Sequence, residues 1–143
     1  MIRLGSLAGY SFEGPRALAG WTAPTVPAVF AILAKSKPDK PQEFAVIYVG
    51  HADDLSQAGF PFRHPRATAW VTRADGKFNL HVCWLEVPGG TRAHREQISQ
   101  ELTAIYNPSC NEHKFDKAWK AEWIGSYDTA VTDHLTTRRD PRG

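Results

Sequence analysis

The sequence has few cysteines and no long apolar run. Its two cysteines, Cys83 and Cys110, lie far apart and belong to no paired motif. They are expected to be reduced thiols of a cytosolic protein and not part of a disulfide framework. No apolar stretch approaches the length of a membrane span, and the N-terminal segment has too short an apolar stretch for a signal peptide. A cytoplasmic protein with no membrane partner is therefore expected.

Sequence motifs for several common chemistries are also missing. The chain has no P-loop, no glycine fingerprint for dinucleotides and no nucleophile elbow. Its six histidines and two cysteines show no zinc-ligand spacing. A nucleotide-binding fold of those types, a hydrolase of the nucleophile-elbow type and a structural zinc are therefore not expected.

The composition is that of one ordinary globular domain. The chain has 143 residues, of which 42% are hydrophobic and 22% are charged. That length can bury one core without disulfides. The formal net charge is +2 and the pI is about 8.6. This weakly basic balance is compatible with a nucleic-acid partner but does not identify one.

Three segments have the composition of β-strands. Residues 27–34 and 43–50 are short apolar runs rich in β-branched and aromatic residues, and the polar segment 35–42 between them suits a hairpin loop. Residues 77–87 alternate between apolar and polar positions, which predicts a third strand. That alternation places four apolar residues on one face: Phe78, Leu80, Val82 and Trp84.

Other segments favour helices and loops. Residues 91–106 have apolar residues at helical spacing, and Pro108 is expected to stop that helix. The apolar positions are Ile98, Leu102, Ile105 and Tyr106. Residues 51–58 are expected to form a short helix, the proline-containing segment 59–67 a loop, and residues 113–127 a last amphipathic helix.

The domain prediction follows from this order of elements. Residues 1–26 are rich in Gly, Ala and Pro without a sustained period, so an irregular N-terminal wrap is expected, held by Tyr10, Phe12 and Trp21. Residues 27–127 form the predicted domain, and 128–143 a polar, flexible tail. Strands interspersed with helices predict an α+β fold, a small mixed sheet flanked by helices.

The predicted hairpin carries a family resemblance. AVFAI (28–32) and IYVG (47–50) resemble the paired GIY and YIG strands of the GIY-YIG nuclease superfamily, a fold shared by homing endonucleases, some restriction enzymes and the excision-repair incision subunit. HADDL (51–55) is similar to the family's turn into a helix. LTAIYNPSCN (102–111) resembles its helix that ends in a Pro-x-x-Asn turn. The resemblance covers roughly residues 26–112 and implies a three-stranded antiparallel sheet.

The resemblance also implies an activity. The family members are metal-dependent endonucleases, so cleavage of phosphodiester bonds, with DNA as the expected partner, is implied here. One Mg²⁺ or Mn²⁺ ion, held mainly by one carboxylate and waters, would stabilise charge on the phosphate. A tyrosine or histidine would help to deprotonate the attacking water, and an arginine would clamp the phosphate.

Two positions match the family's tyrosine and asparagine, and one departs. Tyr48 matches the second tyrosine, although a half-buried strand aromatic is the plainer interpretation. Asn111 matches the asparagine after Pro108, and an ordinary turn-stabilising asparagine is equally compatible. Phe30 stands at the first tyrosine and has no hydroxyl, so it can act only as a wall of the site.

The basic positions depart further from the family pattern. The family's arginine falls at Ala58, and the loop that follows offers Arg63, His64 and Arg66 as a phosphate clamp or simply as a solvated loop. His51 occupies the place of a family lysine and is either a phosphate contact or base, or a surface histidine. A positive face around Tyr48 is predicted for nucleic-acid binding, from Arg63, Arg66, Arg73, Arg92 and Arg95.

The metal carboxylate is displaced from the family position, which falls on Ser99. At about 100° per residue, Glu96 lies about 60° around the helix from Ser99, whereas Glu101 lies on another face. Glu96 is therefore the predicted metal ligand. A solvent-facing charge that pairs with Arg92 or Arg95 is the plainer alternative. An active nuclease would bring the predicted catalytic set into one cleft: Tyr48, His51, Arg63, Glu96 and Asn111.

Three functions stay open on the sequence alone. The first is a Mg²⁺- or Mn²⁺-dependent endonuclease. The second is a nucleic-acid-binding module that keeps the fold without the chemistry, which Phe30, Ala58 and Ser99 favour because catalytic groups act as a unit. The third is a protein-interaction domain, since fold does not fix function.

Overall fold

The computed structural model describes residues 1–5, 9–37, 40–111 and 124–126. Within these residues the chain forms six strands, two α-helices and three short 3₁₀ helices. The strands are β1 (Ile2–Leu4), β2 (Tyr10–Ala17), β3 (Ala28–Lys37), β4 (Lys40–Ala52), β5 (Leu80–Glu86) and β6 (Ile124–Ser126). The helices are α1 (Ala67–Ala74), α2 (Arg92–Tyr106) and the 3₁₀ helices η1 (Leu55–Gln57), η2 (Lys77–Asn79) and η3 (Ser109–Asn111).

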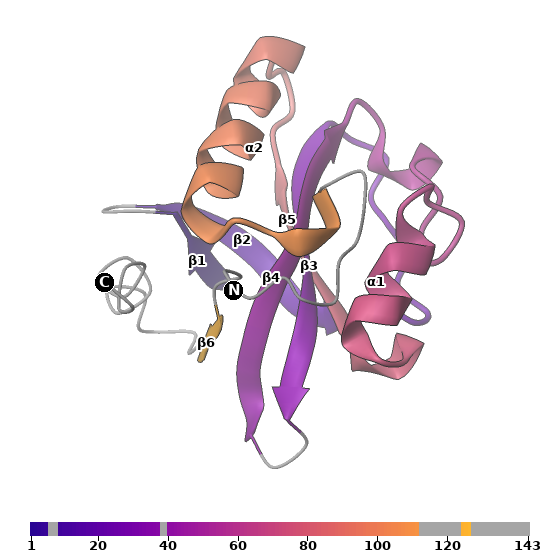
Figure 1. Ribbon diagram of the computed structural model, residues 1–143. Helices are drawn as coiled ribbons and strands as arrows, with labels where there is room; N and C mark the ends of the chain where they lie inside the picture. Colours follow the sequence, from indigo (N-terminus) through magenta and orange to yellow (C-terminus); the bar gives the residue numbers. More distant parts are fainter. Residues whose placement is uncertain (6–8, 38–39, 112–123, 127–143) are drawn as a thin grey trace.

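One antiparallel sheet organises the domain, in the strand order β1-β2-β5-β3-β4-β6 (Figure 1). The α+β class predicted from the sequence is confirmed. The three predicted strands correspond to β3, β4 and β5, and the β3–β4 hairpin is present. The prediction of three strands was too low, because β1, β2 and β6 extend the sheet at both edges.

The N-terminal segment is not the irregular wrap that was predicted. Ile2 and Leu4 on β1 and Phe12 on β2 are buried, and β2 pairs with β5. The sequence signal is weak because β1 has only three residues and the register of β2 shifts between Glu13 and Arg16. An irregularity of that kind interrupts the period-two pattern by which strands are recognised.

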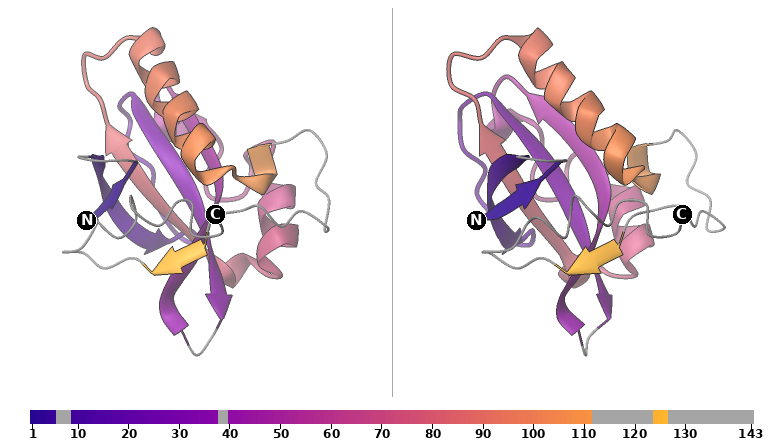
Figure 2. Two further views of the ribbon diagram at one scale, coloured as in Figure 1. Left: turned by 60° about the vertical axis from the view of Figure 1, so that its left-hand side comes forward. Right: turned by 90° about the vertical axis from the view of Figure 1, so that its left-hand side faces the viewer.

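The two helices cover opposite faces of the sheet (Figure 2). Alternate residues of β3 point to different faces, as the pleat requires. Val29 and Leu33 pack in the cluster that includes Ile98 of α2, whereas Phe30 and Ile32 pack in the cluster that includes Trp70 of α1. Every residue from 28 to 34 is buried, so β3 is the centre of the core.

The irregular position in the hairpin decides where Tyr48 points. Ile32 is opposite Tyr48, but the next residue of β3, Leu33, is opposite Val46, so Ile47 is an extra residue on β4. Ile47 and Tyr48 both pack in the α1-side cluster. A bulge of one residue reverses the faces of the side chains that follow it. Tyr48 therefore lies under α1, and the following odd-numbered positions turn toward α2.

The helix predicted over 91–106 is confirmed as α2. The Thr91 side chain accepts a hydrogen bond from the His94 backbone and caps the N-terminus. Ile98 and Leu102 are buried, and Ile105 is partly buried against the same cluster. Each packs as the helical spacing predicted.

Several other expectations need correction. β4 continues through residues 51–52, and only η1 is helical in the predicted 51–58 helix. Helix α1 was not predicted, although the preceding segment forms the expected turns. Phe78 lies in η2 with 77% of its surface exposed and does not share the buried face of β5. Residues 124–126 form strand β6, while the rest of the predicted 113–127 helix and the 128–143 tail lie outside the described residues.

Candidate nucleic-acid interface

Tyr48 lies in an aromatic cluster on the α1 face. Its ring centroid is 5.3 Å from that of Trp70, 5.5 Å from His64 and 5.7 Å from Phe30. Burial raises the pKa of the Tyr48 hydroxyl, and the positive charge of Arg66 opposes that shift only in part. The hydroxyl therefore stays protonated at neutral pH, so it can donate a hydrogen bond but is a poor base.

Phe30 packs against Tyr48 from the neighbouring strand. It is buried and stands opposite Gly50, the last residue of YVG. A Cβ atom built on Gly50 would lie 2.9 Å from the Phe30 ring and 2.9 Å from the Tyr48 ring. Only glycine leaves room for both rings at this point of the hairpin.

His64 is neutral and fixed in orientation. Its Nδ1 accepts the Arg66 backbone N–H at 3.0 Å, and its ring packs 4.7 Å from Trp70. Burial, helped by the positive charge of Arg66, lowers the pKa of His64 to about 4. Because Nδ1 accepts a hydrogen bond, the single proton of the neutral ring lies on Nε2, which can donate.

Arg66 connects the loop before α1 to the turn at 108–111. Its Nε and Nη2 atoms donate to the carbonyl oxygen of Cys110 at 3.0 and 2.6 Å. Arg63, three residues earlier, is exposed. In this conformation Arg66 therefore positions the loop, whereas Arg63 is accessible to a ligand.

Asn111 binds the strand that carries Tyr48. Its Oδ1 accepts the Val49 backbone N–H at 2.9 Å, and its Nδ2 donates to the Val49 carbonyl at 2.8 Å. The side-chain amide thus takes the place of a neighbouring strand at this edge of β4. The segments YVG and PSCN, which carry the family resemblance, are in direct contact through the Asn111 side chain.

His51 lies on the other face of the sheet from Tyr48. Its partner on β3 is Val29, in the α2-side cluster. Its Nδ1 is buried without a hydrogen-bond partner in the described part of the chain. Burial first, and then the charge of Arg95, lowers the pKa of His51, so its ring is neutral at neutral pH. His51 lines a cavity of about 190 Å³ with Ala52, Asp53, Arg92 and Arg95.

Glu96 is engaged in an ion pair on the α2 side. Its Oε2 accepts from the Arg92 Nε at 3.0 Å, one helical turn earlier, and its side chain is 44% exposed. Glu101 accepts instead from the Tyr10 hydroxyl at 2.6 Å. The two glutamates therefore lie on different sides of α2, as the helical angles predicted.

Arg95 is buried, with 3% of its surface exposed. Its Nη2 pairs with the Asp53 carboxylate, and its Nη1 donates to the Gly90 carbonyl at 3.3 Å. These contacts attach the start of α2 to the end of β4, and they leave little of Arg95 accessible to a phosphate.

The predicted positive face is divided by the sheet. Arg63 and Arg66 precede α1 and Arg73 lies on it, whereas Arg92 and Arg95 belong to α2. The predicted single cleft is divided in the same way, since Tyr48 faces α1 while His51 and Glu96 lie on the α2 side. Both expectations were wrong, because α1 and α2 cover opposite faces of the sheet and residues 48 and 51, three positions apart in a regular part of β4, point to opposite faces.

The groups around Glu96 do not fit a magnesium ion. Glu96 is paired with Arg92, and the nearby Asp53 carboxylate is paired with Arg95. Mg²⁺ is held by carboxylates and waters, and it would have to compete here with two guanidinium groups.

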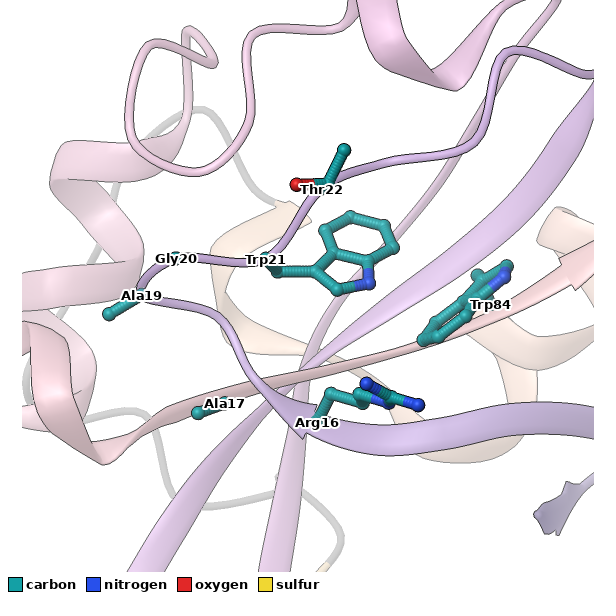
Figure 3. Close-up of a pocket in the computed structure, with 7 residues that line it drawn as sticks. All are labelled: Arg16, Ala17, Ala19, Gly20, Trp21, Thr22 and Trp84. Atoms are coloured by element: carbon teal, nitrogen blue, oxygen red, sulfur yellow. The ribbon is translucent and has the colours of Figure 1, made fainter.

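A second cleft on the α1 side was not predicted from the sequence. It has a volume of about 540 Å³ and lies between β2, the 17–22 segment and β5 (Figure 3). Seven residues line it: Arg16, Ala17, Ala19, Gly20, Trp21, Thr22 and Trp84. The period-two pattern had placed Trp84 on the apolar face of its strand, but nothing in the sequence linked it to Trp21.

The comparisons with known proteins do not assign the chain to a family. No family model, curated protein or solved structure matches it. The resemblance to GIY-YIG nucleases therefore depends on the motifs quoted above. Separately, neither α-helix in the described residues is long and apolar enough to cross a membrane.

Proposed function

We propose that this chain is a nucleic-acid-binding module on a GIY-YIG-like scaffold and that it does not cleave its ligand. The observation that carries the proposal is the separation of Tyr48 from Glu96 by the sheet. The contact between Asn111 and Val49 supports the likeness of the scaffold, because it joins the two segments that carry the resemblance.

Loss of cleavage is supported by the state of each catalytic candidate. Phe30 has no hydroxyl, the raised pKa of Tyr48 keeps its hydroxyl protonated so that it cannot deprotonate water, and Glu96 is paired with Arg92. Catalytic groups that act as a unit lose most of their effect when one is removed. An endonuclease would need Tyr48 and Glu96 to contact the same phosphate, but the two residues lie on opposite sides of the sheet.

Binding is supported by the side chains of the α1 face. Arg63 is exposed next to His64, whose Nε2 proton is available as a donor. Proteins that bind single strands combine basic groups along the backbone with aromatic rings under the bases. Tyr48, Trp21 and Trp84 are partly exposed and supply such rings on this face.

The test measures binding and cleavage on the same substrates. Supercoiled, single-stranded and branched DNA are incubated with the protein and Mg²⁺ or Mn²⁺, and affinity is measured over a range of salt concentrations. We expect binding that weakens steeply with salt, because phosphate contacts release counterions, and no cleavage. Cleavage of any substrate that is lost in Glu96→Gln would establish the endonuclease interpretation instead. Binding that does not depend on salt, or no binding at low salt, would refute the nucleic-acid proposal.

A further inference from the structure

The cleft between β2 and β5 combines an aromatic pair with one cation. The ring centroids of Trp21 and Trp84 lie 4.9 Å apart with 49° between the ring planes. Arg16 reaches toward Trp84 from β2 (Figure 3). It is the only charged residue of the seven that line the cleft, and its guanidinium forms no ion pair or hydrogen bond with any residue in the described ranges.

Contacts with neighbouring residues hold the aromatic pair in place. Phe60 packs edge-on against Trp21 at 5.2 Å, and the Trp21 backbone N–H donates to the Leu18 carbonyl at 3.0 Å. Leu18 in turn donates to Leu80 on β5 at 3.0 Å. The Trp84 indole N–H donates to Glu86 Oε2 at 3.4 Å, which helps to orient its ring in the cleft. A site held in this way loses little side-chain entropy on binding.

We propose that this cleft holds one unpaired nucleobase of a single-stranded segment, stacked on the Trp21–Trp84 pair, with its phosphate on Arg16. The volume of about 540 Å³ falls within the range on the order of 300–1,000 Å³ for ligand clefts. Indole rings stack on any base, and a guanidinium matches phosphate oxygens. A base inside a duplex is already stacked and cannot enter such a cleft.

A chain of ring contacts links the cleft to the Tyr48 cluster on the same face. Phe60 contacts Trp21 and also Phe30, at 4.9 Å between ring centroids, and Phe30 contacts Tyr48 at 5.7 Å. One strand lying on the α1 face can therefore reach both places. This inference rests on the proposed function and adds to it that the ligand is single-stranded at the cleft.

The test compares cleft variants with matched controls. A dye-labelled single-stranded oligonucleotide and a duplex of the same sequence are titrated by fluorescence anisotropy. Trp84→Ala should weaken single-strand binding by roughly tenfold to a hundredfold, whereas Trp84→Phe should recover part of the loss. Arg16→Gln should lower the slope of log affinity against log salt by about 0.7. Phe78→Ala and Arg3→Gln remove an exposed ring and an exposed cation outside the cleft and should match wild type.

The outcomes separate the cleft from the function of the whole chain. If wild type binds neither nucleic acid, the proposed function and the cleft assignment both fail. If wild type binds but Trp84→Ala and Arg16→Gln behave like their controls, only the cleft assignment fails. If a cleft variant loses duplex binding and single-strand binding equally, the assignment of the cleft to an unpaired base is also wrong. A mononucleotide that displaces the strand at the strand's own Kd would identify a free-nucleotide site instead.

Thermal melts establish that each variant is folded. If Trp84→Ala unfolds, Arg16→Gln still tests the cleft, because Arg16 is exposed.

Discussion

Asn111 and Val49 are joined by two hydrogen bonds between a side-chain amide and one residue's backbone. Oδ1 accepts from the Val49 N–H and Nδ2 donates to its carbonyl, at 2.9 and 2.8 Å. The turn after α2 thereby completes the edge of β4 next to Tyr48. Chain segments separated by 62 positions in the sequence are aligned by this single side chain.

Removing the Asn111 amide should destabilise the fold. Asn111→Ala leaves the Val49 N–H and carbonyl without partners, which should lower the free energy of unfolding by about 1–3 kcal/mol. Asn111→Asp should also be destabilising, because a carboxylate cannot donate to the Val49 carbonyl. Urea denaturation measures both, with exposed Gln57→Ala as the control, expected within about 0.5 kcal/mol of wild type. An Asn111→Ala variant as stable as that control would show that water replaces the amide.

The burial of His64 should make stability depend on pH. Its pKa is lowered to about 4, from an ordinary 6.5, by burial and by Arg66. The unfolded state therefore binds a proton first as pH falls, and stability present above pH 6.5 is lost between about 6.5 and 4. His64→Asn can still accept the Arg66 N–H and should show a smaller loss over that window. An NMR titration of His64 near its ordinary pKa would contradict the burial of the ring.

Glu96→Gln should leave nucleic-acid binding unchanged. The substitution removes an exposed i,i+4 ion pair with Arg92, which contributes only about 0.3–0.5 kcal/mol. Glu101→Gln is the matched control, because it removes a carboxylate from the other side of the same helix. Affinity and cleavage are measured together for both variants. Loss of a measurable cleavage activity in Glu96→Gln alone would restore the role that the sequence predicted for this residue.

Arg95 and Arg63 should respond in opposite ways. Arg95→Ala removes a buried guanidinium that holds Asp53 and Gly90, so unfolding should become easier by about 1–3 kcal/mol while affinity per folded molecule stays constant. Arg63→Gln should keep stability and lower the salt slope of single-strand binding by about 0.7. Denaturation and anisotropy, applied to both variants, make the comparison. A salt slope lowered by Arg95→Ala instead would place the ligand on the α2 side.

The sequence predicted the centre of the fold better than its edges. The hairpin strands are short apolar runs, β5 alternates and α2 has a period of 3.6, and each was found where expected. β1 has three residues and β6 has three, which is too short for a period to emerge. Helix α1 has eight residues and follows a proline-containing loop, so its short apolar pattern gave no clear signal.

The sequence identified individual candidate residues of the site, but it did not show which of them share a face of the sheet. Tyr48 and Asn111 lie close together, as the motif order implied, but Tyr48 and Glu96 do not. The difference comes from Ile47, a bulged residue on β4. It reverses the faces of the residues that follow it, so Tyr48 points toward α1. Bulges depend on how two strands pair, which a single segment does not reveal. The cleft likewise joins the 16–22 segment to Trp84 on β5, and only the folded chain brings these two segments together.

The position of β3 has a consequence for motion within the domain. Residues 28–34 are buried on both faces, and β3 is paired on both sides, with β4 and with β5. Local opening at either helix leaves this strand covered by the other layer. Its backbone amides should therefore exchange with solvent deuterium only when the whole domain unfolds, so they report global stability. The layers that α1 and α2 form can open separately, and β3 stays paired with its neighbouring strands in either case.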